Sequence, residues 1–295
     1  MRKVLTPEGL FAYDRSSGIC IFTPDIRSDR WVKPLYAQIA ITERCNLRCP
    51  FCYASSSPDK GKMWDLEGLM ELIHFLDSYG LLGVALGGGE PFMHPQLCEI
   101  VRRTWNETGL DVSITTNGFA ATKERIGQIE GYASEVRVSV RRPEDCAVLR
   151  RFLGRRFELG VNLLLFRGNT SLLERLVGKC VAMGVRDFLI NSFIAVGRGA
   201  QHKDWEPEAE DVKGLCRIIE RFKDGATFKV SGRLASELRK HAEFEFMPFT
   251  DERRGRIIAI TADRRVKPSS LSEEAYAFSK PEEIPEIYRR LIAGC

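Results

Sequence analysis

Three closely spaced cysteines are the residues of this chain best suited to chemistry. Cys45, Cys49 and Cys52 follow a C-x3-C-x2-C spacing within eight residues. Thiolates are soft ligands that suit zinc, copper(I) and iron–sulfur clusters. An iron–sulfur cluster usually takes four thiolates, so three thiolates without a close fourth leave one iron open to another ligand. The spacing therefore favours a catalytic cluster. A zinc site completed by a distant His and three unrelated buried cysteines are the alternatives.

A glycine-rich turn is the second feature with chemical potential. Gly88, Gly89, Glu90 and Pro91 follow the apolar run 83–86. Glycine lets a backbone approach a ligand closely because it has no Cβ, and a carboxylate can pair with an ammonium group. Proline fixes the direction of the turn. The segment therefore indicates a binding turn, with an ordinary strand-to-helix turn as the alternative.

Short polar and basic residues occur at or after two further apolar runs. Thr116 and Asn117 follow one run, and Ser139 and Arg141 follow the other. Hydroxyl and amide groups can hydrogen-bond a ribose or a carboxylate, and an arginine can pair with a carboxylate. We expect these four residues to border a cofactor site, although Arg141 can equally face solvent.

The elements that position these residues follow a repeated strand–helix pattern, which predicts βαβ units and a parallel sheet. The apolar patterns predict strands at 36–41, 83–86, 112–116, 135–140, 161–166 and 187–191, and helices at 65–79, 95–108, 121–130, after Pro143 and at 171–183. In parallel β/α barrels the functional loops follow the C-terminal ends of the strands. The candidate residues lie at these ends.

The two ends of the chain have different patterns. Apolar segments at 10–13 and 19–22 flank a turn and predict a β-hairpin. After the polar stretch 201–207, the patterns predict a helix at 208–222, a strand at 226–230, a helix at 233–241, a hairpin within 256–268 and a helix at 281–292. We therefore expect an N-terminal extension at 1–35, a core at 36–200 and a small α+β extension at 201–295.

Composition limits the class of protein. The 295 residues are 44% hydrophobic, which permits a large core. The net charge of +4 is mild, and the Arg pairs alternate with acidic residues, so a solvated surface is favoured over a nucleic-acid groove. No apolar run approaches the roughly 20 residues of a membrane span. The chain has nine cysteines, and its N-terminus lacks a secretory segment. These two features together predict a reducing, cytoplasmic location.

Together these motifs resemble the signature of the radical S-adenosylmethionine (radical SAM) enzymes. Cys45, Cys49 and Cys52 match the cluster ligands, Phe51 matches the aromatic residue of the motif, and residues 88–91 match the segment that holds the methionine amino group of S-adenosylmethionine (SAM). The resemblance implies a partial (β/α)6 TIM-like barrel and a 4Fe–4S cluster whose fourth iron binds SAM. It also implies that Ser139 contacts SAM, while Arg141 departs from the family pattern.

Two further segments resemble parts of peptide-modifying members. Gly197 and Arg198 resemble a Gly-Arg segment after the sixth strand, and the C-terminal region resembles a SPASM or twitch extension. Pro268-Ser269 stands where such extensions carry Pro-Cys. We therefore expect the shape of the extension without its auxiliary clusters, and one cluster per chain.

The resemblance implies that the protein cleaves SAM to a 5′-deoxyadenosyl radical that abstracts a substrate hydrogen, in the modification or maturation of a peptide or protein. The alternatives are a small metabolite or nucleotide as substrate, or a non-catalytic iron–sulfur or zinc protein. A one-electron donor of the flavodoxin or ferredoxin type is implied. A separate peptide-recognition partner is possible because 1–35 is short for the usual recognition domain. No pattern identifies an acid, base or radical-quenching residue. His94 is either an ordinary loop residue or a polar contact near the cofactor.

Overall fold

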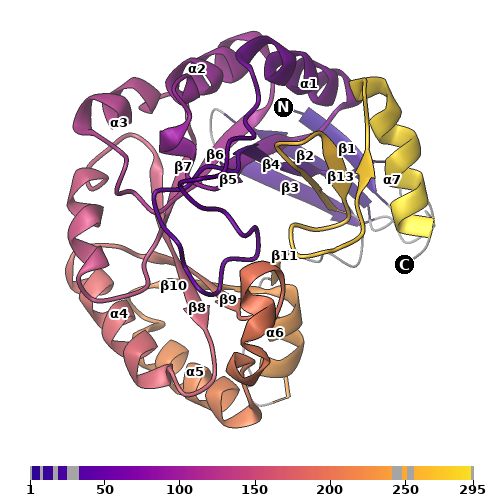
Figure 1. The fold of residues 1–295 in the computed structure, drawn as a ribbon. Helices are drawn as coiled ribbons and strands as arrows, with labels where there is room; N and C mark the ends of the chain where they lie inside the picture. The colour runs from indigo at the N-terminus through magenta and orange to yellow at the C-terminus, as the bar shows by residue number, and fades with distance from the viewer. Residues whose placement is uncertain are drawn as a thin grey trace.

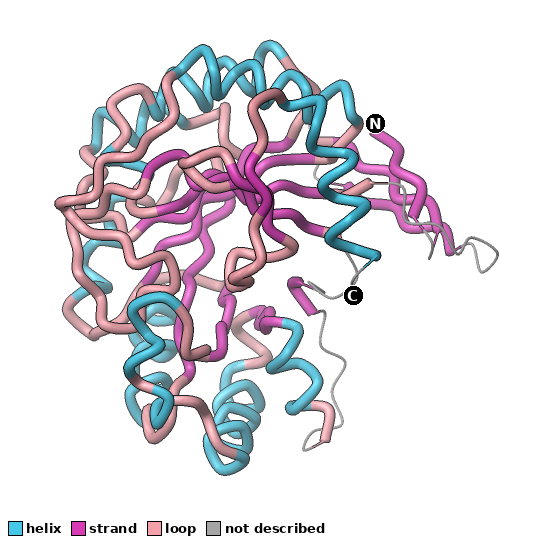
Figure 2. The backbone as a smooth tube through the Cα atoms, turned by 45° about the vertical axis from the view of Figure 1, so that its right-hand side comes forward, coloured by secondary structure: helices cyan, strands magenta, loops and turns pink. Residues whose placement is uncertain are grey.

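The computed structural model describes residues 2–6, 9–15, 19–24, 33–240, 248–250 and 256–293. Within these ranges the main feature is a sheet with the strand order β11-β10-β9-β8-β7-β6-β5-β4-β12-β13-β14. Figure 1 shows this sheet as a curved surface with helices α1 to α5 along its outer side. Figure 2 shows the same arrangement after a turn of 45°.

Neighbouring strands from β11 to β12 are parallel. These strands are β4 (Tyr36–Thr42), β5 (Gly83–Gly88), β6 (Asp111–Thr116), β7 (Glu135–Ser139), β8 (Glu158–Leu165), β9 (Asp187–Ser192), β10 (Thr227–Ser231), β11 (Pro248–Thr250) and β12 (Ile257–Ile260). The helices are α1 (Leu66–Tyr79), α2 (Leu97–Glu107), α3 (Lys123–Ile129), α4 (Thr170–Ala182), α5 (Ala209–Phe222), α6 (Gly232–Leu238) and α7 (Ile284–Ala293).

Apolar periodicity explains how these elements pack. In β8, Val161 and Leu163 are buried in the core, whereas Asn162 between them points to the other face of the sheet and accepts a hydrogen bond from Arg137. In α1, the residues Leu69, Leu72, Ile73 and Leu76 form one buried stripe. The core therefore lies between the sheet and the outer helices, and the opposite face of the sheet carries polar side chains.

The predicted α/β fold is confirmed, and the six predicted core strands are β4 to β9. The sheet is not closed, because its described strands end at β11 on one side and β14 (Tyr276–Ala277) on the other. It is thus a partial barrel.

The prediction of a helix after Pro143 needs a correction. This segment is the 3₁₀ helix η2 (Asp145–Arg151), in which Asp145 N donates to Arg142 O and Ala147 N donates to Glu144 O. A 3₁₀ helix rises ~2.0 Å per residue against ~1.5 Å in an α-helix. The residues of η2 therefore cover more length than the same number of residues would in an α-helix. The chain then turns at Gly154, which has a φ of 71°, before β8 begins.

The N-terminal hairpin is confirmed as β2 (Gly9–Asp14) and β3 (Ile19–Pro24), and β1 (Arg2–Thr6) adds a strand that was not predicted. In β1 the apolar residues Val4 and Leu5 are adjacent, so the strand shows no alternation. Arg15, which follows β2, connects this small sheet to the segment between α2 and β6, since its Nη1 donates to Thr108 O at 2.8 Å.

The C-terminal hairpin is confirmed as β12 and β13 (Arg265–Lys267). Because β10 pairs with β9 and β12 pairs with β4, the main sheet continues on both sides of residue 200. The division of the chain at 35 and 200 stays a prediction. The predicted helix at 233–241 corresponds to α6, and residue 241 lies outside the described residues. No helix in the described ranges is long and apolar enough to cross a membrane.

Candidate active site

The three cysteines lie on one loop, which starts at the C-terminal end of β4. We call residues 43–57 the cysteine loop. Cys45 N donates to Ser57 O at 3.1 Å, and Cys52 N donates to Cys49 O at 3.2 Å. Cys45 is 9% exposed, and Cys49 and Cys52 are half-buried. The backbone of the loop therefore folds back on itself around the thiols.

The surroundings of Cys45 disfavour the ionised form of its thiol. Burial raises the pKa of the Cys45 thiol, and the charges of Glu90, Cys49 and Cys52 raise it further. A bound metal lowers the pKa of a coordinating thiol strongly enough to deprotonate it. A bound metal would therefore favour the ionised form of the Cys45 thiol.

The glycine-rich turn after β5 packs directly on the cysteine loop. Gly89 N donates to Thr42 O at 2.7 Å, and Glu90 N donates to Arg44 O at 2.9 Å. A Cβ on Gly89 would lie 2.2 Å from Arg44 O, and Gly88 has a φ of 112°. Gly88 and Gly89 therefore let the backbone of the glycine-rich turn contact the backbone at residues 42–44. Gly87 is different, because a Cβ there would meet nothing within 4 Å.

Glu90 joins the turn after β5 to the end of β6. Its side chain is 0% exposed and accepts hydrogen bonds from Thr116 Oγ1 at 2.6 Å, Asn117 N at 2.7 Å and Phe92 N at 3.0 Å. Burial raises the pKa of Glu90, and these donors oppose the rise. The carboxylate is engaged by protein groups, so Glu90 is a positioning residue here. Its contact with a ligand ammonium stays a prediction.

Thr116 and Asn117 complete this connection. Thr116 is 2% exposed, and its hydroxyl oxygen also accepts from Gly118 N at 2.8 Å. Asn117 Nδ2 donates to Asn46 Oδ1 at 2.9 Å and lies 3.8 Å from Cys45 Sγ. The loops after β4, β5 and β6 are thus linked by one hydrogen-bonded network.

Arg141 reaches the cysteine loop from the other side. Its Nη1 donates to Cys49 Sγ at 3.3 Å, and its Nε donates to Asp145 Oδ2 at 2.9 Å. The side chain is 17% exposed, which contradicts a solvent-facing position. Its Nη2 is buried and has no hydrogen-bond partner in the described part of the chain. The two N–H groups of this nitrogen therefore remain for a ligand.

The remaining predicted residues lie at the same edge of the sheet. Phe51 is half-buried on the cysteine loop, and Ser139 is the half-buried last residue of β7. Pro91 begins the short helix η1 (Pro91–Met93), as its fixed φ predicts. Contacts of Phe51 and Ser139 with a ligand stay predictions.

The donor set fits a cluster. Within the described residues, no three His, Cys, Asp or Glu side chains converge as ligands of a single ion do. A cluster makes a different demand, because each thiolate binds its own iron and the thiolates stand apart. Three thiols on one short loop are the type of donor that such a cluster takes.

The pattern that defines the Radical SAM superfamily matches residues 39–212. The chain belongs to this superfamily. Radical SAM enzymes use a 4Fe–4S cluster and SAM, and the matched range includes the cysteine loop and the glycine-rich turn.

Curated relatives of this radical SAM protein include enzymes of two kinds. A GTP 3′,8-cyclase of Chlorobaculum tepidum is 32% identical over 117 residues, which cover 39% of this chain and 36% of the relative. The antilisterial bacteriocin subtilosin biosynthesis protein AlbA of Bacillus subtilis is 24% identical over 219 residues, which cover 67% of this chain and 49% of AlbA. The chain thus spans less than half the length of these two relatives.

Among solved structures, Streptococcus suis SuiB has the same fold. SuiB bound to its precursor peptide SuiA matches with a TM-score of 0.69 at 18% identity, over 89% of this chain and 66% of SuiB. SuiB bound to SAM matches with a TM-score of 0.66 at 16% identity, over 89% of this chain and 68% of SuiB.

The sequence patterns did not indicate Asp145 as a site residue of this radical SAM protein, and they indicated Arg198 without its contact to the cysteine loop. Asp145, which is 2% exposed, holds Arg141, and Arg198 contacts the carbonyl groups of the cysteine loop. The four-residue separation of Arg141 and Asp145 is a sequence signal from which their ion pair could be expected. The spacing of Arg198 from the cysteines carries no such signal.

His94 is an ordinary structural residue. It is 1% exposed, its Nε2 lies 2.8 Å from Trp64 O, and its Nδ1 accepts from Gln96 N at 3.1 Å. These two bonds require the neutral ring with the proton on Nε2.

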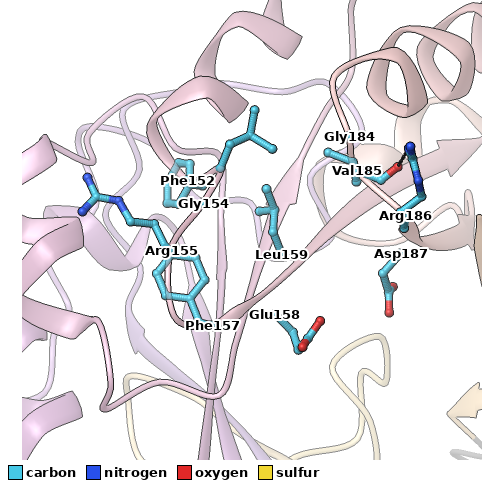
Figure 3. Close-up of a pocket in the computed structure, with 11 residues that line it drawn as sticks. Phe152, Gly154, Arg155, Phe157, Glu158, Leu159, Gly184, Val185, Arg186 and Asp187 are labelled. Carbon is cyan, nitrogen blue, oxygen red and sulfur yellow. Dashed lines mark hydrogen bonds between the residues drawn. The ribbon is translucent and has the colours of Figure 1, made fainter.

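A separate pocket of about 260 Å³ lies far from this site. Figure 3 shows it at the beginnings of β8 and β9, where Glu158 lies beside Phe157 on one side and Asp187 lies beside Arg186 on the other. The cysteine loop follows the opposite, C-terminal end of the parallel sheet. Because functional loops of β/α barrels lie at that C-terminal end, the pocket is not part of the candidate active site.

Proposed function

We propose that this protein is a radical SAM enzyme that modifies a peptide or protein, with its cluster on Cys45, Cys49 and Cys52. The observation that carries the proposal is the network that joins the cysteine loop to the loops after β5, β6 and β7. Cys49 Sγ accepts from Arg141, Asn117 lies beside Cys45, and Glu90 connects Asn117 to the glycine-rich turn. A structural metal site needs no such neighbours.

When bound, the cluster supplies one electron that cleaves the sulfonium of SAM to methionine and a 5′-deoxyadenosyl radical. The protein's own residues have three tasks. The three cysteines hold the cluster, the unpartnered Nη2 of Arg141 binds the SAM carboxylate, and the open backbone at Gly87 leaves room for a ligand.

The face of the sheet opposite the helices suits a polar substrate. Arg137 is 3% exposed and donates to Asp187 and, at 3.4 Å, to Asn162 Oδ1. Lys229 Nζ lies 2.6 Å from Asp187 Oδ2. These side chains come from β7, β8, β9 and β10 and pair with one another, which makes this face of the sheet polar.

Similarity to AlbA and to SuiB with its peptide supports the peptide or protein substrate. Similarity to a GTP 3′,8-cyclase favours a nucleotide as the second candidate. A flavodoxin- or ferredoxin-type donor and a separate peptide-recognition partner complete the proposal. The non-catalytic alternative predicts a cluster or zinc site that does not cleave SAM.

Anaerobic reconstitution with iron and sulfide, followed by SAM and dithionite, tests the chemistry. The wild type should contain about four iron atoms per protein and form 5′-deoxyadenosine. A variant with Cys45, Cys49 and Cys52 all changed to Ala should do neither. The control changes Cys98 and Cys216, half-buried cysteines of α2 and α5, to Ala and should retain both properties. Absence of 5′-deoxyadenosine from the wild type, or its undiminished formation by the triple variant, would refute the enzyme proposal.

Substrate class is tested with the same reconstituted enzyme. A short peptide encoded beside the gene and GTP are added in separate reactions, and deuterium transfer from each labelled substrate into 5′-deoxyadenosine is measured. Transfer from the peptide supports the proposal. Transfer from GTP alone contradicts it in favour of the nucleotide.

A further inference from the structure

We propose that Gly197 and Arg198 form a clamp that positions the cysteine loop for its cluster. The inference rests on the proposed cluster at Cys45, Cys49 and Cys52. It assigns Arg198 as a positioning residue, which acts through the backbone of the ligand loop rather than on the substrate.

Arg198 contacts the loop through three hydrogen bonds. Its Nη1 donates to Cys49 O at 2.7 Å, and its Nη2 donates to Ser56 O at 2.7 Å. Its backbone N donates to Cys52 O at 2.9 Å. Two of the three acceptors belong to cluster ligands. The planar guanidinium offers donors in a fixed fork, so it sets the distance between Cys49 O and Ser56 O.

Gly197 lets its own segment approach the cysteine loop closely enough for these hydrogen bonds. Its φ is 57°, and a Cβ there would lie 2.1 Å from Tyr53 O and 2.8 Å from Cys52 O. Real side chains do not tolerate such distances. The left-handed backbone and the missing side chain are therefore both needed at this contact.

Packing on the β8–β9 side holds the clamp in place. Gly197 begins the short helix η3 (Gly197–Gln201), and the His202 ring stacks on Trp205 with centroids 4.2 Å apart. Trp205 also packs against Phe166 and Phe193 at 5.8 and 5.9 Å. These aromatic contacts join the segment after Gly197 to Phe166 and Phe193, so they help to hold the clamp in place.

The charge of Arg198 adds a second effect. Reduction potentials of iron–sulfur clusters depend on nearby charge and hydrogen bonding, and groups behind metal ligands affect affinity strongly. A guanidinium behind Cys49 favours the more negative, reduced cluster. Loss of Arg198 should thus loosen the loop and make the cluster harder to reduce.

The test compares anaerobically reconstituted wild type with Arg198→Gln, Arg198→Lys and Gly197→Ala. Iron release to a chelator and the midpoint potential of the cluster are measured, with thermal unfolding as a check on folding. The matched control is Arg186→Gln, because Arg186 Nη1 also donates to two carbonyls, Val181 O at 2.7 Å and Val185 O at 3.0 Å, away from the site.

Arg198→Gln should release iron about tenfold faster than the wild type and have a lower midpoint potential. Arg198→Lys keeps the charge but not the fork, so it should release iron faster with little change in potential. Gly197→Ala should release iron faster with its charge intact, and Arg186→Gln should match the wild type in both measurements.

Equal rates of iron release in wild type, Arg198→Gln and Gly197→Ala would overturn the clamp. An equal loss in Arg186→Gln, or a loss that only follows reduced thermal stability, would also overturn it. A wild type that takes up no cluster refutes the proposed function itself, which separates the two failures.

Discussion

Arg141 occupies the contact between the cysteine loop and the loop after β7. Asp145 fixes two of its donors, Cys49 accepts from Nη1, and Nη2 remains for a ligand. A guanidinium held in this way needs no rearrangement to bind a carboxylate. The fixed orientation of the Arg141 guanidinium, more than its charge, thus suits it to bind a carboxylate.

Arg141→Lys should weaken SAM binding. The ammonium group of Lys cannot contact Asp145, Cys49 and a carboxylate in the same fixed geometry. Loss of one hydrogen bond to a charged group costs ~1.5–3 kcal/mol, which corresponds to a rise of about 10–100-fold in the Kd for SAM. Anaerobic equilibrium dialysis of the reconstituted protein measures this change.

The control is Arg142→Lys, since Arg142 also pairs with Asp145, at 3.4 Å, but is 70% exposed. An unchanged Kd in Arg141→Lys, or an equal rise in Arg142→Lys, would remove Arg141 from the SAM site.

The loops after β4, β5 and β6 behave as one unit because buried polar groups connect them. Glu90 ties the turn after β5 to β6, and His94 ties the start of α2 to the segment after the cysteine loop through Trp64 O. Each connection holds a titratable group in one protonation state. The stability of this unit should therefore depend on pH.

The stability of the wild type should fall as the pH falls below about 6.5, the pKa of a His in an unfolded chain. Burial lowers the pKa of His94 in the folded protein, so the unfolded chain binds its proton first. The His94 contribution is present above pH 6.5 and is lost as the pH falls through the lower, folded pKa. His94→Gln cannot bind this proton.

Urea unfolding at pH 7.5, 6.5 and 5.5 checks this expectation. The free energy of unfolding of His94→Gln should decrease less over this range than that of the wild type. A decrease of the same size in both proteins would show that His94 does not contribute to the pH dependence.

The whole molecule is organised by one sheet that draws strands from both sides of residue 200. β12 pairs with β4, the strand that leads into the cysteine loop. Trp64 Nε1 donates to Thr261 O at 3.2 Å, and the Trp64 ring stacks on Phe278 with centroids 6.3 Å apart. The C-terminal region thus supports the strand that leads into the cysteine loop.

Ile258→Ala should destabilise the whole protein. Ile258 is 1% exposed in β12, and removal of such a side chain from a core costs ~2–5 kcal/mol. Because β12 belongs to the main sheet, fluorescence and circular dichroism should report one shared unfolding transition. Ile257→Ala is the control, since Ile257 is half-buried in the same strand and should cost less. Two separate transitions, with only the later part of the chain affected, would contradict this expectation.

The linear sequence determined the local features of this protein. Apolar periodicity identified strands β4 to β9 and most helices, and the spacing of Cys45, Cys49 and Cys52 identified the ligand loop, because both signals lie within a few neighbouring residues. Composition alone could not identify the 3₁₀ form of η2 or the strand β1.

Only the tertiary structure decided which groups meet. Arg198 contacts Cys49 O across 149 residues, β12 pairs with a strand more than 200 residues earlier, and the Glu90 carboxylate accepts a hydrogen bond from Thr116 Oγ1. Such contacts depend on how separate elements pack, and packing leaves no periodic trace in the chain.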